Sequence, residues 1–282
     1  MREYPVFIPY GEEHIAAVVT VPDAVPRGLV VLATGLGATR SHRYQIWTRT
    51  ARRLASEHDL ASVRWEYLGI GDSTSDIAVW GLHRRPTGEV VSVARFAMEA
   101  VGVDRVAVSG NCVGSWVSIE LASRLPECIG ACLIRLPMLA PDAITLLKRK
   151  TKRSKLISRV RKNPRLRRMI GKPLGGQRRP VLPFIRDAFP GAMAHGRMLL
   201  LYGEDDFTFS PRVRSALQEL AAELPEPNRS NYEVRALPGQ RLQGFERREI
   251  QDLVVDTVVD WMGEVFDESD RGRGGQTSAV SA

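Results

Sequence analysis

A cysteine lies at the centre of the stretch Gly110-Asn-Cys-Val-Gly114, where its thiol could meet a substrate. Small and β-branched residues precede this stretch from 106 to 109, and an apolar, helix-periodic segment follows from 115 to 124. The pattern predicts a strand, a sharp turn and a helix, with glycines where strand and helix nearly touch. Such a turn strains its central residue and exposes the side chain. Cys112 is therefore the candidate nucleophile, and a small buried core cysteine is the alternative.

The chemistry available to this residue follows from its thiol. A serine hydroxyl needs a general base to become nucleophilic, whereas a thiol with a reference pKa near 8.5 is already a few per cent thiolate at neutral pH. Attack by Cys112 on an acyl group therefore does not require a histidine. Release of that acyl group to water would be slow without a base, and an amine or a second thiol would be a better acceptor.

Strands and helices alternate around the cysteine. Two runs predict an opening β-hairpin, at 4–10 and 14–22, and further strands are predicted at 28–34, 60–65, 105–109, 129–136, 197–202 and 232–236. Helices are predicted at 43–57, 88–100, 115–124, 211–224 and 246–266. Several of the strands are too apolar to be half-exposed. The alternation predicts an α/β protein with a mostly parallel central sheet covered on both faces.

Four stretches together resemble the site of the α/β-hydrolase family, in the same order and at about the same spacing. Cys112 replaces the serine of that family's nucleophile elbow, G-x-S-x-G. Ala33-Thr-Gly-Leu-Gly37 stands where the family has His-Gly after its third strand. The turn at 68–73, Leu-Gly-Ile-Gly-Asp-Ser, resembles R-G-x-G-x-S with leucine in place of arginine, and Gly203-Glu-Asp-Asp206 matches G-x-x-D. The resemblance covers residues 4–266 and implies the α/β-hydrolase fold.

The resemblance implies roles for three further residues. The backbone N–H groups of Leu36 and Val113 would form an oxyanion hole, and Asp206 would be the acid of the triad. The family's histidine usually follows a Leu-Pro-Gly-like turn, which is Leu237-Pro-Gly239 here. Gln-Arg-Leu comes next, and no histidine occurs after His195. The usual general base is therefore absent from its position.

Topology narrows the candidates for a replacement base. In a parallel sheet the active site lies at the C-terminal ends of the strands. His42, just after the predicted oxyanion loop, is the first candidate as a catalytic residue, and His83 is the second. Glu66 could act as an acid or base, or make a structural hydrogen bond to the neighbouring loop. Asp206 could simply cap a turn. The base is left open among His42, His83, Glu66 and none.

The positive charge of the chain is concentrated in one segment. The net charge is +8, yet residues 137–196 alone hold sixteen Lys or Arg and two acids. This segment contains several prolines and glycines, and apolar residues at helical spacing between them. We predict a basic, largely helical cap at 137–196, inserted into an α/β-hydrolase core of 1–136 and 197–266. The tail at 267–282 is rich in Gly, Ser, Asp and Arg and is predicted to be disordered.

Charge held in one place favours an anionic partner. An acidic acyl carrier protein, or the phosphates of coenzyme A, could dock on the cap and deliver an acyl group; a solvated cap face is the alternative. Nucleic acid is not favoured, because few aromatic residues lie among the charges. Binding of an amphipathic basic cap to a membrane surface is possible but not favoured. Three cysteines, no apolar h-region at the N-terminus and no apolar run of about 20 residues predict a cytoplasmic protein.

Neither a metal nor a cofactor is predicted. Cys128 and Cys132 have no partnering Cys/His pair to complete a zinc site and are expected in the core. The sequence predicts a thiol-dependent acyltransferase, thioesterase or esterase that forms an acyl-enzyme on Cys112 with a small-molecule acyl substrate. Two alternatives of other classes stay open: a non-hydrolytic lyase or cyclase on the same fold, and a non-catalytic ligand-binding protein, which the missing histidine favours.

Overall fold

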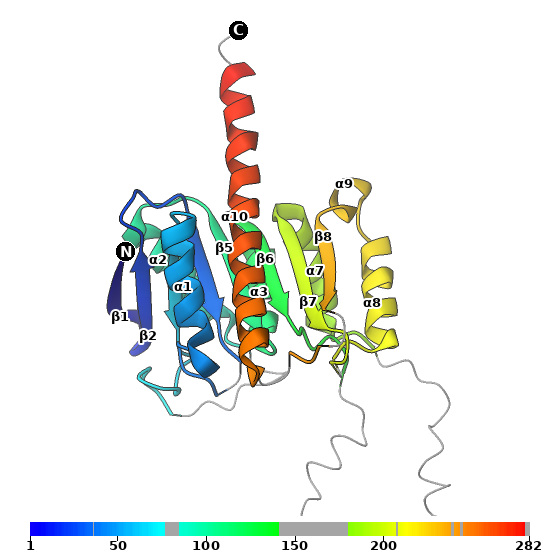
Figure 1. Ribbon diagram of the computed structural model, residues 1–282, viewed down its shortest axis with the longest axis horizontal. Helices are drawn as coiled ribbons and strands as arrows, with labels where there is room; N and C mark the ends of the chain where they lie inside the picture. The colour runs from blue at the N-terminus through cyan, green and yellow to red at the C-terminus, as the bar shows by residue number, and fades with distance from the viewer. Residues whose placement is uncertain are drawn as a thin grey trace, which may run out of the picture.

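The computed structural model describes residues 1–35, 37–76, 85–140, 180–206, 208–237, 240–242 and 245–279. Its centre is an eight-stranded sheet with the order β1-β2-β4-β3-β5-β6-β7-β8 (Figure 1). The strands are β1 (Arg2–Tyr10), β2 (Glu13–Val21), β3 (Leu29–Ala33), β4 (Ala61–Trp65), β5 (Val106–Asn111), β6 (Cys128–Ile134), β7 (Arg197–Gly203) and β8 (Tyr232–Leu237). Strand β2 is antiparallel to both β1 and β4, and all other neighbours are parallel.

Helices cover both faces of the sheet, because parallel neighbours need crossover connections. The helices are η1 (Arg43–Gln45), α1 (Ile46–Glu57), α2 (Thr87–Val101), α3 (Gly114–Arg124), α7 (Pro183–His195), α8 (Pro211–Ala222), α9 (Glu226–Arg229) and α10 (Arg248–Ala279). Helices α1 and α10 pack on one face, and α2, α3, α7 and α8 pack on the other (Figure 1). Strands β3, β4 and β5 are buried along their whole length, which explains their apolar sequences. The predicted α/β architecture, a mostly parallel sheet covered on both faces, is confirmed.

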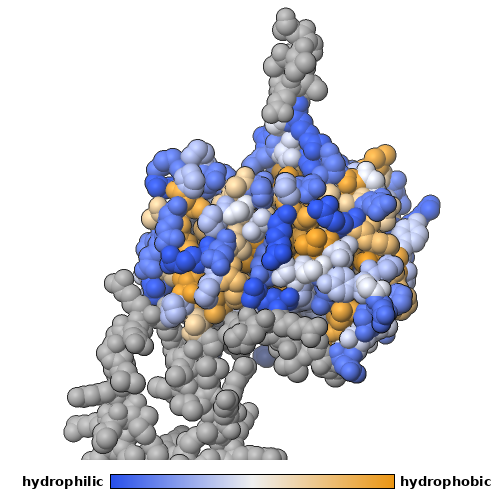
Figure 2. All heavy atoms as spheres, turned by 180° about the vertical axis from the view of Figure 1, so that it is seen from behind, coloured by the Kyte–Doolittle hydropathy of each residue, from blue (hydrophilic) through white to orange (hydrophobic). Residues whose placement is uncertain are grey.

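Figure 2 shows the face that α2, α3 and α7 cover, where hydrophilic and hydrophobic residues are intermixed. Among the described helices, none combines the length and the apolar character that crossing a lipid bilayer requires.

Helix α7 lies inside the segment that the sequence assigns to the cap, at 137–196, but it belongs to the core. It buries Ile185, Phe189 and Met193 and packs against α3. Pro190 and Gly191 resemble helix breakers, yet a Cβ at Gly191 would lie only 2.9 Å from the Oγ of Ser123, so the glycine allows α7 to approach α3. Residues 183–195 of that segment therefore pack with the core, and the limits 137–196 of the cap stay a prediction. The remaining candidate cap residues, 141–179, lie outside the described residues.

The segment 267–279, which is predicted to be disordered, continues helix α10 beyond the edge of the sheet (Figure 1). Ion pairs fix its first turn: Arg27 lies 2.7 Å from Asp267 and 2.5 Å from Asp270, and Arg105 lies 2.6 Å from Asp270. The composition of residues 267–279 is typical of disorder. Composition alone does not indicate that Arg27 and Arg105 pair with the aspartates of this segment. Residues 280–282 lie outside the described residues.

Candidate active site

Cys112 lies at the turn between β5 and α3 and is half-buried. Its φ is +55°, in the left-handed region that residues other than glycine rarely adopt. The Cys112 N–H donates to the carbonyl oxygen of Ile134 on β6 at 2.8 Å, and the N–H of Ser115 donates to the Cys112 carbonyl oxygen at 3.0 Å. Bonds from a neighbouring strand and from the first helical turn thus hold the strained residue in place.

Two glycines make this turn possible. A Cβ at Gly110 would lie 2.3 Å from the Oγ of Ser118 on α3. A Cβ at Gly114 would lie 2.5 Å from the carbonyl oxygen of Thr34 and 2.6 Å from that of Ala33. The end of β3 is therefore pressed against the first turn of α3, immediately beside Cys112.

The loop after β3 also lies beside the elbow, as the predicted oxyanion hole requires. A Cβ at Gly35 would lie 4.0 Å from the Cβ of Cys112. The Tyr67 hydroxyl donates to the Thr34 carbonyl oxygen at 2.8 Å and fixes the start of this loop. At the start of α3, no described backbone carbonyl accepts the N–H of Val113. Leu36 lies outside the described residues, so the structure places one of the two predicted oxyanion donors.

His42 is the candidate base that the structure brings to the elbow. Its Nε2 lies 3.1 Å from the side-chain nitrogen of Asn111, the residue before Cys112. The ring packs edge-on against Trp47 and against Phe245, which comes from the loop after β8 where the family places its histidine. Burial lowers the pKa of His42 to about 4. The imidazole is therefore neutral at physiological pH.

Asp206, at the position of the family's acid, pairs with an arginine. Its Oδ1 lies 3.2 Å from the Nε of Arg135, and its Oδ2 accepts the N–H of Gly203 at 2.9 Å. The Nε of Arg135 and the Oδ1 of Asp206 form no hydrogen bond with each other, so their contact is an ion pair. Both side chains are buried. Arg135 directly follows β6 with a φ of +54°, and nothing in the sequence pattern marks it as the partner of Asp206.

We expect the Asp206→Ala variant to be less stable by about 1–3 kcal/mol, because it removes one buried partner of Arg135 and the acceptor of the Gly203 N–H. Urea unfolding measures the change. Glu223→Ala is the matched control, since it removes a half-exposed pair with Arg186 and should cost less than about 1 kcal/mol. If Asp206→Ala kept wild-type stability and lost only the reactivity of Cys112, Asp206 would instead serve the chemistry.

The other predicted acid–base candidates are placed differently. Glu66 is fully buried and accepts the N–H groups of Arg40 and Asp72, at 3.1 and 2.8 Å, and the Arg40 guanidinium at 2.7 Å. These are the contacts of a carboxylate that ties two loops together, which is the structural alternative for this residue. His83 lies outside the described residues.

Cys112 is the accessible thiol of the chain. Cys128 and Cys132 are buried in the core, and burial raises the pKa of each to about 12. Within the described ranges, no group of three or more His, Cys, Asp or Glu residues could hold a metal ion. Two residues of the site, Asn111 and Arg135, are not predicted from the sequence. Only the position of Asn111 inside the elbow motif could have drawn attention to it.

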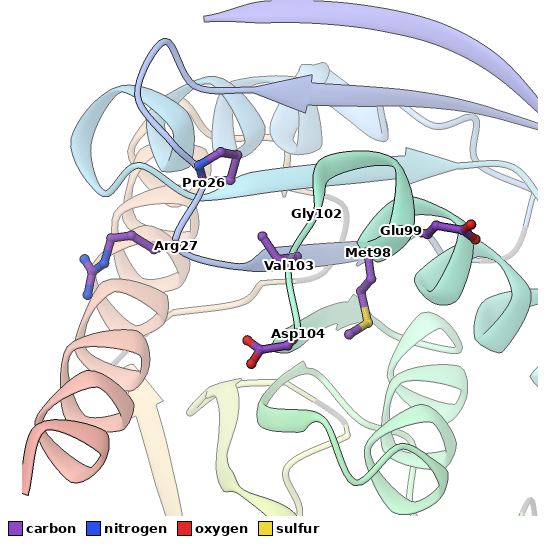
Figure 3. A pocket seen from close by; sticks show the side chains of 7 residues that line it. All are labelled: Pro26, Arg27, Met98, Glu99, Gly102, Val103 and Asp104. Carbon is purple, nitrogen blue, oxygen red and sulfur yellow. The ribbon is translucent and has the colours of Figure 1, made fainter. Parts of the chain in front are cut away.

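A hollow of about 500 Å³ lies at the other end of the sheet (Figure 3). It is lined by residues that precede β3 and β5, among them Arg27, Val103 and Asp104, and by Met98 and Glu99 from the end of α2. Cys112 follows the C-terminal end of β5. The hollow and the elbow therefore lie at opposite edges of the parallel strands, and the hollow is not part of the candidate active site.

Comparisons with known proteins find this architecture in solved structures. No family model and no curated protein matches the sequence. The carboxyl esterase of Bacillus coagulans superposes with a TM-score of 0.65 at 13% identity, over 94% of this chain and 99% of that chain. The proline iminopeptidase of Mycobacterium smegmatis gives 0.61 at 15% identity, over 94% and 100%. Est1E of Butyrivibrio proteoclasticus, solved with ferulic acid, gives 0.60 at 14%, over 93% and 99%.

Proposed function

We propose that this chain, which has the α/β-hydrolase fold, is an acyl-transfer enzyme with Cys112 as its nucleophile. Fold alone does not determine an activity, so the proposal rests on the site. The observation that carries it is the accessible thiol at φ +55° between two glycines, at the position of the family's nucleophile. One of the similar structures is named as a carboxyl esterase and another as a proline iminopeptidase, which agrees with acyl chemistry.

The proposed reaction begins from the thiolate of Cys112, whose proton has gone to solvent. The sulfur forms a bond to the carbonyl carbon of an ester or thioester, and the carbonyl electron pair moves to the oxygen. The N–H of Val113, with Leu36 as the second predicted donor, would stabilise that oxyanion. Collapse of the intermediate breaks the bond to the leaving alkoxide or thiolate, which takes up a proton from solvent. The acyl group remains on the sulfur of Cys112.

The contacts of the described acid–base groups favour an acceptor that is itself nucleophilic. The Nε2 of His42 lies against the Asn111 amide, and Asp206 pairs with Arg135. Glu66 is held by Arg40 and Asp72. Transfer from Cys112 to a thiol or amine therefore has more support than transfer to water, which makes acyltransferase the favoured form of the proposal and esterase or thioesterase the other.

The proposed acyl donor is a thioester on an anionic carrier, either an acidic acyl carrier protein or coenzyme A. The support is the sequence, which holds sixteen basic and two acidic residues between 137 and 196. Guanidinium and ammonium groups bind phosphates and carboxylates well. A cytoplasmic location, where such carriers are available, stays a prediction.

The test is a mass measurement on the intact protein. Incubation with acyl-coenzyme A thioesters of increasing chain length should raise the mass by one acyl group, and peptide mapping should place it on Cys112. The Cys112→Ala variant should gain nothing, whereas Cys132→Ala, which changes a buried core thiol, should be acylated as the wild type is. Faster acylation by coenzyme A esters than by the matching N-acetylcysteamine esters would support the anionic carrier. No adduct across the whole panel would overturn the proposal.

The two alternatives give different results in the same set of proteins. A turnover that survives Cys112→Ala would indicate lyase or cyclase chemistry on this fold. A ligand that binds tightly and is recovered unchanged from the wild type would indicate a binding protein.

A further inference from the structure

A buried contact between His42 and Asn111 joins two distant parts of the chain beside the nucleophile. Their side-chain nitrogens lie 3.1 Å apart, although the residues are 69 positions apart in sequence. His42 is 8% exposed and Asn111 is 6% exposed. The contact links the loop that leads into α1 with the elbow, one residue before Cys112.

The identity of the two atoms determines where the imidazole proton lies. In the structure the side-chain nitrogen of Asn111 faces the ring, and this nitrogen can only donate. The Nε2 of His42 then accepts, and the proton of the neutral ring is on Nδ1. Trp47 and Phe245 enclose the ring, and this burial disfavours the charged imidazolium. Arg43 acts on the pKa of His42 in both directions: its backbone hydrogen bond raises the pKa, and its positive charge lowers it, so burial is the cause of the low value. The lone pair that faces the elbow is therefore already engaged by Asn111.

Backbone strain is present on both sides of this contact. His42, Tyr44 and Gln45 have φ values of +59°, +55° and +56°, and Cys112 has +55°. Such conformations in residues other than glycine persist only where the surrounding structure fixes them. The hydrogen bond between His42 and Asn111 joins the strained loop to the strained elbow, and Trp47 and Phe245 pack against the His42 ring. These contacts can fix both backbone conformations.

We propose that His42 and Asn111 are positioning residues, whose hydrogen bond holds Cys112 in its attacking conformation, and that His42 does not receive the proton of the Cys112 thiol. This inference rests on the proposed function only in taking Cys112 as the nucleophile. It replaces the role of base, for which His42 is the first candidate from the sequence. If the Asn111 amide had the opposite orientation, its oxygen would face the ring, the proton would be on Nε2 and Nδ1 would have a free lone pair. Measurement of the His42 tautomer distinguishes these two orientations.

The first test is direct and needs no variant. Long-range ¹⁵N–¹H NMR correlations of the imidazole report its tautomer and its charge. From pH 5 to pH 9 we expect His42 to stay neutral with the proton on Nδ1, because its pKa lies near 4. A proton on Nε2, or a titration near the ordinary histidine pKa of about 6.5, would overturn the proposal.

The second test measures alkylation of Cys112 by iodoacetamide against pH, followed by mass spectrometry. His42→Gln retains an acceptor for Asn111 and should react within about threefold of wild type, with the same single ionisation. His42→Phe retains a ring but leaves the Asn111 N–H unpaired, so its rate should fall about tenfold at every pH, with an unchanged midpoint. Asn111→Ala removes the donor from the other side and should match His42→Phe.

Two outcomes of the alkylation experiment would overturn the positioning role. A midpoint that shifts only when His42 is replaced would show that the imidazole exchanges a proton with the thiol. Wild-type rates in both His42→Phe and Asn111→Ala would show that the contact has no influence on Cys112. Neither experiment uses an acyl substrate, so a protein that passes both and still forms no acyl adduct would contradict the proposed function alone.

Discussion

The Cys112→Ser variant should form an acyl-enzyme about 10²–10⁴-fold more slowly than the wild type, the factor that a positioned general base supplies to a hydroxyl. A thiol ionises to a useful extent at neutral pH without such a base, and a hydroxyl does not. The described candidates for the base are engaged elsewhere, His42 by Asn111 and Glu66 by Arg40, and the predicted acid Asp206 pairs with Arg135. The serine would stand at the position of the family's nucleophile but would have no described base to deprotonate its hydroxyl.

Stopped-flow or quenched mass measurements of acyl-enzyme formation test this expectation. Cys132→Ser is the matched control, because it makes the same atomic change in a fully buried thiol that no substrate reaches. It should acylate at the wild-type rate if it retains its fold. Acylation of Cys112→Ser within about tenfold of wild type would contradict the expectation, since it would require a working base at the elbow.

The fold could be predicted from the sequence because its signals are local. The buried strands β3, β4 and β5 are recognisable from continuous apolar runs, and the elbow from glycines that stand where backbones touch. Local patterns also explain why the bounds of α7 are not predicted. Pro190 and Gly191 in α7 resemble a break, and only the packing against Ser123 shows that Gly191 serves a close approach.

The contacts within the site could not be predicted, because each joins residues far apart in the chain. Arg135 meets Asp206 across neighbouring strands, and His42 meets Asn111 across 69 positions. The order of the chain placed His42 at the correct edge of the sheet, but it gave no information on which ring nitrogen would face the elbow. The continuation of α10 past residue 266 could not be predicted for the same reason. Its aspartates pair with Arg27 and Arg105, which lie far away in the sequence.

The Gly114→Ala variant should lose about 1–3 kcal/mol of stability and most of the reactivity of Cys112. Its Cβ would lie 2.5 Å from the Thr34 carbonyl oxygen and 2.6 Å from that of Ala33, and these backbone atoms cannot rotate away as a side chain could. Helix α3 and the end of β3 would have to separate. That movement would displace the N–H of Val113 from the loop after β3, so the oxyanion site would open as the fold weakened.

Gly272→Ala in the exposed part of α10 is the matched control for this substitution. Nothing lies within 4 Å of its Cβ position, and alanine in a helix is more favourable than glycine by about 0.5–1 kcal/mol. In urea unfolding, Gly114→Ala should therefore be less stable than the wild type and Gly272→Ala more stable. Iodoacetamide should label Cys112 at the wild-type rate only in Gly272→Ala. Equal stability and labelling in both variants would mean that β3 and α3 are not packed as closely as the elbow requires, and the placement of Cys112 as an attacking group would lose its structural basis.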